Sequence, residues 1–384
     1  MSSLIPEDLT QPGTHALVIG VSEYLHLVDG KDPTPTGISF GMEQLSAAAK
    51  SASEFAAWLL NEYQCDHAPL RSLRVLLSPA DGEEINSDIA QLLPANSSVT
   101  TNNVKDALGE FRHACDASVD NIAIVYVAGH GVQITKTGAI VLLSDFGDAH
   151  FLSKLEGAID MAGVHAGMNH PKTAKTQFWF VDACRQKPAI AKKFETLSGA
   201  LTLDEPIGAT ETSPLFLAAG TGKQAYARVG GVTLFNEALL WALRGNVANG
   251  PEADMDHWHI PVTALIKHLP EYVKALAADC GAEQSVDIAG KIHEAVIHEC
   301  PDTPKVELCI DLTPEDAKPV SKGCLKLNAK TPVIDNYSNW PIQQPVDAGL
   351  YLLDISTVAP FHSKSDVLNI KPPPKPPVSY DLSV

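Results

Sequence analysis

Short apolar runs recur along most of the chain, and each one stops abruptly at a glycine or a polar residue. Runs of this length without a polar face are typical of strands buried on both sides of a parallel sheet. They occupy residues 15–21, 72–78, 121–131, 138–145, 176–184 and 213–220. Stretches with apolar residues at helical spacing lie among them, at 43–63, 102–115, 233–243 and 260–278. This alternation predicts an α/β fold, a mostly parallel sheet covered by helices on both faces.

Two of the expected helices begin at residues that can cap them. Asn102 or Asn103 is expected to cap the helix that ends near Cys115, and Thr233 is expected to cap the helix that follows it. A side-chain oxygen at such a position binds a free backbone N–H of the first turn. These residues therefore predict where the two helices start.

The sequence changes character after about Gly290. Short β-like runs separated by Pro, Asp, Ser and Gly clusters replace the helix-forming stretches. This pattern indicates a small β-sandwich, so we expect one domain at residues 1–290 and an accessory domain at 291–384. The segment KPPPKPP at 371–377 suits a stiff connector better than a polyproline ligand, and it receives no functional assignment.

The chain is strongly acidic, with a formal net charge of -18. Such a charge repels phosphate backbones and anionic lipid surfaces, so neither a nucleic acid nor a membrane is an expected partner. The 7 cysteines are scattered without a C-x-x-C pair, and the first residues lack the features of a signal peptide. We therefore expect a cytoplasmic protein in a reducing compartment, and no cofactor or metal is expected.

Two apolar runs end in residues suited to nucleophilic catalysis. His130 ends one run between Gly129 and Gly131, and Cys184 ends another. Polar residues at the carboxyl ends of parallel strands meet at one edge of the sheet, where ligands bind. A histidine beside a cysteine lowers the pKa of the thiol and can protonate a leaving amine. The pair therefore predicts attack of the Cys184 thiolate on a carbonyl group.

The same strand ends offer donors for the oxyanion that forms in such a reaction. The backbone N–H groups of Gly131 and Cys184 are expected to provide them. Taken singly, a free cysteine is most often a buried structural residue, and the chain has 14 histidines. The catalytic interpretation depends on the two residues occurring together at the ends of apolar runs.

The motifs around this pair resemble those of the caspase, metacaspase and bacterial caspase-like family. Caspases carry Q-A-C-[RQG]-G about 50 residues after their histidine. Here D-A-C-R-Q contains Cys184, which follows His130 at an interval of 54 residues. HALVIGVSEY, LLSD, LFLAAGTGKQAYA and GGVTLFNEALL extend the resemblance over residues 14–280. The resemblance implies a caspase-like fold and a cysteine endopeptidase with a protein substrate, and the C-terminal part is similar to sandwich domains appended to bacterial members.

One residue departs from the caspase pattern. Caspases have Gln two residues before the nucleophile and arginines in a pocket that reads aspartate, whereas this chain has Asp182, as metacaspases do. An acidic pocket favours Arg or Lys at the substrate's P1 position, and the alternative is that Asp182 only organises the strand end. Ala218, Ala219 and Gly220 occupy the region where caspases use an arginine, and their backbone is expected to pair with the substrate.

The polar segment from Gln186 to Ser213 follows the nucleophile at the place where family members carry an activation loop. Lys192 and Lys193 lie in it and are candidate sites of self-cleavage, while an ordinary surface loop is the alternative. The resemblance further implies a role in bacterial immunity or cell death, with a regulatory protein partner at the C-terminal domain. Metacaspase calcium sites are not recognisable in the sequence.

Two other functions are alternatives to a protease that cleaves after basic residues. A catalytically silent caspase-like scaffold would bind partners without cutting them, but the intact His130 and Cys184 count against it. An aspartate-specific caspase is disfavoured by Asp182.

Overall fold

A computed structural model describes most of the chain. The described residues are 2–33, 42–133, 139–153, 155–185, 199–203, 211–251 and 256–383. They form two compact units, one made of Met1–Leu240 with Ile266–Ile297 and the other of Trp241–Leu265 with His298–Val384. Within the described ranges, no helix combines the length and the apolar character needed to span a bilayer.

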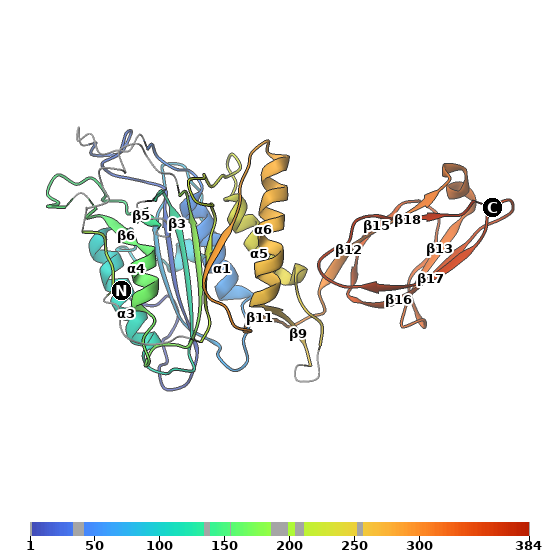
Figure 1. Ribbon diagram of the computed structural model, residues 1–384, viewed down its shortest axis with the longest axis horizontal. Helices are drawn as coiled ribbons and strands as arrows, with labels where there is room; N and C mark the ends of the chain where they lie inside the picture. Colours follow the sequence, from blue (N-terminus) through green and yellow to red (C-terminus); the bar gives the residue numbers. More distant parts are fainter. Residues whose placement is uncertain are drawn as a thin grey trace. The chain divides into compact units, whose positions relative to one another are not determined.

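The first unit is built on a six-stranded sheet with the order β10-β8-β7-β3-β1-β2 (Figure 1). Its strands are β1 Thr14–Val21, β2 Leu70–Ser78, β3 Ile122–Gly129, β7 Thr176–Ala183, β8 Ser213–Leu217 and β10 Asp287–Lys291. All neighbours run parallel except β10, which pairs antiparallel with β8 at the edge. The predicted α/β class and the mostly parallel sheet are confirmed, because five of the six apolar runs form adjacent parallel strands.

Helices cover both faces of this sheet. The α-helices of the described residues are α1 Ala48–Asn61, α2 Ser87–Leu92, α3 Thr101–Cys115, α4 Met161–Gly167, α5 Leu234–Trp241 with a π-helical extension at Ala242–Asn246, and α6 Val262–Asp279. Figure 1 shows α3 and α4 on one face of the sheet and α1 on the other. Phe55 of α1 stacks on Tyr126 of β3 with ring centroids 4.6 Å apart. This aromatic contact packs α1 against the centre of the sheet.

Two helix starts differ from the expected positions. Thr100, not Asn102 or Asn103, caps α3, because its hydroxyl accepts a hydrogen bond from the Asn103 N–H. The helix expected from residue 43 begins at Ala48, where Ser22 at the end of β1 accepts backbone N–H groups of the first turn. Residues 43–47 are therefore free to line a pocket.

The apolar run at 138–145 does not join the central sheet. It forms β5 Ile140–Leu142, which pairs antiparallel with β4 Gly131–Val132 and with β6 Ala158–Asp160. A strand that follows its neighbour after so few residues can only turn back on it, since a parallel neighbour needs a crossover of a dozen residues or more. This small sheet holds the backbone directly after His130.

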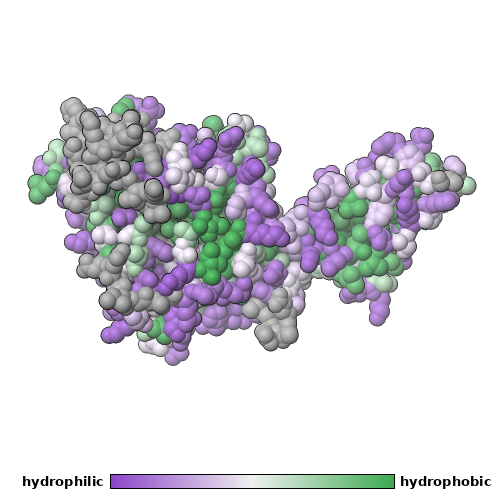
Figure 2. All heavy atoms as spheres, in the orientation of Figure 1, coloured by the Kyte–Doolittle hydropathy of each residue, from purple (hydrophilic) through white to green (hydrophobic). Residues whose placement is uncertain are grey.

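The second unit contains a β-sandwich. One sheet has the order β15-β12-β18 and the other β14-β13-β16-β17. The strands are β12 Lys305–Thr313, β13 Lys322–Leu327, β14 Thr331–Tyr337, β15 Ile342–Asp347, β16 Gly349–Ser356, β17 Lys364–Ile370 and β18 Val378–Asp381; β9 Trp258–Pro261, β11 Val296–Cys300 and a 3-10 helix at Glu315–Val320 complete the elements. A separate core fills the space between the two sheets. In Figure 2 hydrophobic residues also gather on the visible face of this unit.

Candidate active site

His130 and Cys184 emerge side by side at the carboxyl edge of the central sheet. Gly129 at the end of β3 pairs in register with Ala183 at the end of β7, so the next residue of each strand leaves the sheet at the same level. Both side chains line one open pocket of about 630 Å³. The other lining residues are Gln44, Leu45, Ser46, Ala47, Ala48, Gly129, Asp182, Ala183, Ala225, Tyr226, Ala227 and Thr233.

The His130 ring is held in one tautomer. Its Nε2 lies 2.7 Å from the carbonyl oxygen of Glu43, and because a carbonyl only accepts, Nε2 carries the proton and Nδ1 has a free lone pair. The ring of Tyr24 lies 4.9 Å from the imidazole, and its hydroxyl accepts the backbone N–H of His130 at 2.7 Å. Burial lowers the pKa of His130 below its usual value. The imidazole is therefore a neutral base.

The Cys184 thiol is held by the loop opposite. The Ala225 N–H donates to Sγ at 3.3 Å, and the thiol lies 3.7 Å from the Ala225 carbonyl oxygen. Burial raises the pKa of Cys184, and the charge of Asp182 adds to the increase. Among the described contacts there is no hydrogen bond between Cys184 and His130. The free site thus holds a neutral thiol and a neutral imidazole, and the proton must move when substrate is attacked.

Gly131 packs against the backbone of the nucleophile. A Cβ at this position would lie 2.2 Å from the Cys184 carbonyl oxygen and 2.8 Å from the Ala183 Cβ. No side chain fits into this space, so glycine is required by the close approach of the two strand ends. The two residues expected to donate to the oxyanion are thereby brought into contact.

Asp182 lies at the bottom of the same pocket. Residues two apart in a strand point to the same face, which places the Asp182 carboxylate beneath Cys184. Its side chain is buried, with an exposed fraction of 3%. Oδ2 accepts hydrogen bonds from Tyr126, at 2.7 Å, and from Thr233, while Oδ1 is buried without a partner. Burial raises the pKa of Asp182 to about 6.

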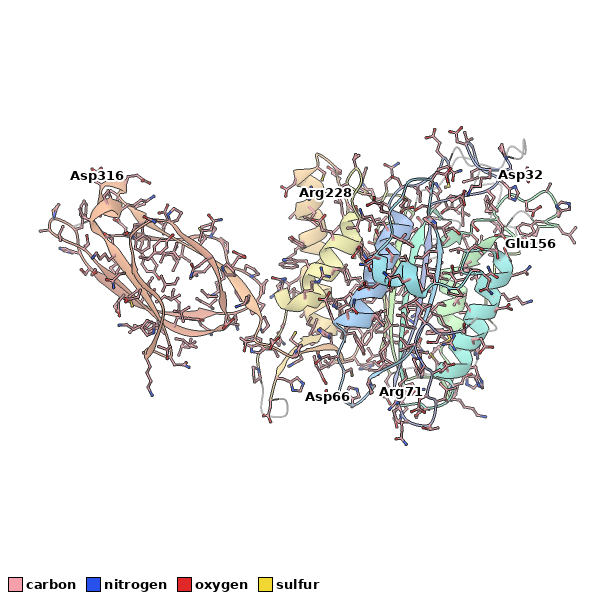
Figure 3. The ribbon with its side chains drawn as sticks, turned by 180° about the vertical axis from the view of Figure 1, so that it is seen from behind. Asp32, Asp66, Arg71, Glu156, Arg228 and Asp316 are labelled. Atoms are coloured by element: carbon pink, nitrogen blue, oxygen red, sulfur yellow. The ribbon has the colours of Figure 1, made fainter. Side chains whose placement is uncertain are left out.

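No arginine or lysine lines this pocket within the described part of the chain. Arg228, which follows the loop at 225–227, turns to the periphery and binds Glu237 at 3.0 Å (Figure 3). Arg185, next to the nucleophile, is buried against Asp287 at 2.6 Å. These two cations are thus bound elsewhere, and Asp182 is the acidic residue of the pocket lining.

Ala218, Ala219 and Gly220 do not reach the pocket. The Ala218 N–H donates to Val181 and its carbonyl accepts from Gln284, so this backbone is already occupied. The Ala219 carbonyl accepts from Arg185, and that of Gly220 from Lys223. Lys192 and Lys193 lie outside the described residues.

The loop at 225–227 lines the pocket, whereas residues 218–220 do not. Ala227 bridges to Thr233 in a tight hairpin whose hydrogen bonds join Tyr226 to Leu234 and Arg228 to Val232. In such a pair the N–H and C=O of Ala227 point away from Thr233. A free backbone edge thus borders the pocket, and no periodic pattern in the sequence marks it.

Comparisons with known proteins place most of the chain in one family. Residues 14–275 match the model of the peptidase C14 caspase domain. An uncharacterized protein, y4kE of Sinorhizobium fredii, is 24% identical over 267 residues, which cover 67% of this chain and 74% of that protein. The crystal structure of caspase-1 from Spodoptera frugiperda aligns with a TM-score of 0.39 at 11% identity, over 75% of this chain and 95% of that one.

The family match defines the class of protein. The chain belongs to the caspase-domain family of cysteine peptidases, peptidase C14. The predicted resemblance is confirmed over most of the chain.

Proposed function

We propose that the chain is a cysteine endopeptidase that cleaves proteins after arginine or lysine, with Cys184 as nucleophile and His130 as general base. One observation carries the specificity: Asp182 lines the same pocket as the catalytic pair, and its carboxylate has a buried oxygen, Oδ1, without a partner. A buried carboxylate oxygen without a partner is costly, and a cationic P1 side chain would satisfy it.

The reaction follows from the arrangement of the pair. Nδ1 of His130 takes the thiol proton as Sγ of Cys184 attacks the scissile carbonyl, and the N–H groups of Gly131 and Cys184 stabilise the oxyanion. The protonated imidazole then gives its proton to the leaving amine, which leaves an acyl-enzyme on Cys184. Water, deprotonated by His130, hydrolyses this thioester.

The substrate backbone has its own site. An extended peptide that pairs with the free N–H and C=O of Ala227 would lie along the 225–227 loop. This pairing would hold the P1 residue over Asp182 and its carbonyl against Cys184. We propose this loop, in place of Ala218, Ala219 and Gly220, as the backbone-binding element.

A panel of fluorogenic peptides that differ only at P1 tests the proposal. Arg and Lys peptides should be cleaved, Asp peptides should not, and Cys184→Ala should abolish activity while Cys280→Ala, which removes an exposed thiol, keeps it. Asp182→Asn should lower kcat/KM for the Arg peptide by about a hundredfold, since one partner of a buried charge pair is lost. Cleavage of every peptide by Cys184→Ala would disprove the nucleophile, and preference for Asp would disprove the pocket. A folded protein inactive on all peptides would favour a scaffold.

We also propose that the protease cuts itself after Lys192 or Lys193, since both match the P1 specificity and follow the nucleophile in sequence. Mass spectrometry of purified wild type and Cys184→Ala would detect the cut. An intact segment in active wild-type protein would exclude it. Membership of the caspase-domain family supports a role in cytoplasmic immunity or cell death, with residues 1–290 as the protease domain and residues 291–384 as the accessory domain that receives a regulatory protein.

A further inference from the structure

Strand β17 is the edge of its sheet in the sandwich. Within the described residues it pairs only with β16. The Val367 N–H donates to the carboxylate of the adjacent Asp366 at 2.8 Å, so it is not directed at β16. Because backbone groups alternate between the two edges of a strand, the N–H and C=O of Asn369 also point outward. An unpaired edge of this kind can accept a further strand.

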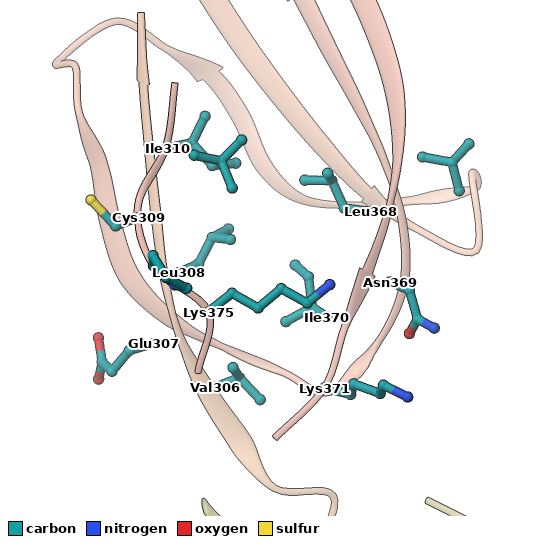
Figure 4. Close-up of a pocket in the computed structure, with 13 residues that line it drawn as sticks. Val306, Glu307, Leu308, Cys309, Ile310, Leu368, Asn369, Ile370, Lys371 and Lys375 are labelled. Atoms are coloured by element: carbon teal, nitrogen blue, oxygen red, sulfur yellow. The ribbon is translucent and has the colours of Figure 1, made fainter. Parts of the chain in front are cut away.

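A pocket opens beside this edge, between β17 and β12. Its volume is about 620 Å³. Figure 4 shows Leu308 and Ile310 extending from β12 toward Leu368 and Ile370, while Glu307 points away from them. The floor is thus aliphatic, and apolar side chains that entered it would leave water.

Two lysines border the aliphatic floor. Lys371 and Lys375 both line the pocket, and in Figure 4 the side chain of Lys375 extends across it toward Ile370. Neither has a carboxylate within ion-pair distance among the described residues. Three other lysines of this unit do have acidic partners, namely Lys305, Lys318 and Lys326. The pocket therefore has a local positive charge in a strongly acidic chain.

The connector between β17 and β18 does not close the edge. Five of its residues, at 372–374, 376 and 377, are proline. Proline has no backbone N–H, so this segment cannot supply the regular hydrogen bonds of a strand. The unpaired edge of β17, the apolar pocket and the ammonium groups of Lys371 and Lys375 therefore lie beside one another.

We propose that the edge of β17 and the adjoining pocket bind an extended segment of a partner protein, with apolar side chains at alternate positions and a carboxylate beside Lys371 and Lys375. The backbone of that segment would pair with Asn369. Its alternate side chains would enter the aliphatic pocket, as the period of a strand requires. The unpaired lysines make an acidic segment fit better than a neutral or basic one.

The test measures peptide binding to the full chain with Cys184→Ala, which prevents cleavage. A fluorescein-labelled peptide that alternates Val and Glu serves as probe in fluorescence anisotropy, beside one that alternates Val and Lys and one with an N-methylated backbone. The Val-Glu peptide should bind, and the other two should bind at least about tenfold more weakly.

Variants locate the site. Lys371→Glu with Lys375→Glu should weaken binding of the Val-Glu peptide about tenfold. Lys322→Glu with Lys330→Glu makes the same charge change elsewhere in the unit and should leave binding unchanged. Equal affinity in both double variants would overturn the proposal, as would equal binding of the Val-Lys peptide. A dimer that Asn369→Pro dissociates, without peptide binding, would assign the edge to a second copy and also overturn it.

Discussion

The side-chain amide of Gln44 binds the backbone of Tyr24 at both ends. The Tyr24 N–H donates to Oε1 at 2.7 Å, and Nε2 donates to the Tyr24 carbonyl at 3.0 Å. Tyr24 in turn accepts the backbone N–H of His130, and Glu43, adjacent to Gln44, accepts the imidazole Nε2–H. One amide therefore joins the two segments that orient the imidazole.

We predict that Gln44→Leu lowers kcat about ten- to thirtyfold and leaves KM nearly unchanged, because the two hydrogen bonds that position Tyr24, worth about 1 kcal/mol each, are lost together with a third to the Val28 carbonyl. Steady-state kinetics on the Arg peptide check this. The pH profile should also broaden on its acidic side if the imidazole leaves Glu43. The matched change Gln343→Leu, at an exposed position of the sandwich, should have no effect, and a Gln44→Leu change confined to KM would contradict the positioning role.

Asp182 should make the fold less stable as pH rises. Its folded-state pKa of about 6 lies above the ordinary 3.8, so the folded protein retains a proton that the unfolded chain has lost, and stability decreases as pH rises through this interval. Asp182→Asn removes the effect. The free energy of unfolding of the variant, taken relative to wild type, should be about 1–2 kcal/mol higher at pH 8 than at pH 5, as measured by urea unfolding. An equal difference at both pH values would mean that the carboxyl is not buried.

Cys184 should be slow to alkylate near neutral pH. Burial raises its thiol pKa, and only the thiolate reacts, so the rate with iodoacetamide should still increase between pH 7 and pH 9. Peptide mass spectrometry can follow Cys184 and the exposed Cys280 in the same sample. A rate for Cys184 that is constant over this range would indicate a preformed thiolate–imidazolium pair instead.

Gly131→Ala should inactivate the protease with little loss of folded protein. The new Cβ would contact the Cys184 carbonyl and force the nucleophile out of position, so kcat should fall by about a hundredfold or more. Gly109→Ala in α3 is the matched control, because a Cβ there meets no neighbour and should stabilise the helix by about 0.5–1 kcal/mol. Normal activity of Gly131→Ala would show that the strand ends can separate freely.

The strand ends were predictable because they depend on local pattern. His130 and Cys184 each follow a continuous apolar run, and parallel packing necessarily brings such ends to one edge of the sheet. Asp182 is two residues from Cys184, so strand alternation alone puts it on the same face. The burial of Asp182 and the lack of a partner for its Oδ1 depend on how Tyr126 and Thr233 pack against it. These tertiary contacts cannot be read from the local sequence.

The walls of the pocket were not predictable in this way. Residues 43–47 have helical spacing, yet Ser22 fixes the start of α1 at Ala48, and Gln44 to Ala47 line the site outside the helix. The backbone of Ala218 is bound by Gln284, and the loop at 225–227 lines the pocket where residues 218–220 do not. Both outcomes depend on hydrogen bonds between residues distant in sequence.

The absence of arginine and lysine from the described pocket lining affects the choice of chemical labels. Reactive peptides ending in aspartate, designed for aspartate-cleaving caspases, would bring a carboxylate against Asp182 and be repelled. If Asp182 reads a basic P1 residue as proposed, reactive peptides ending in arginine would label Cys184. Under the proposed specificity, a survey of caspase-domain proteins that relied on aspartate labels alone would miss this chain.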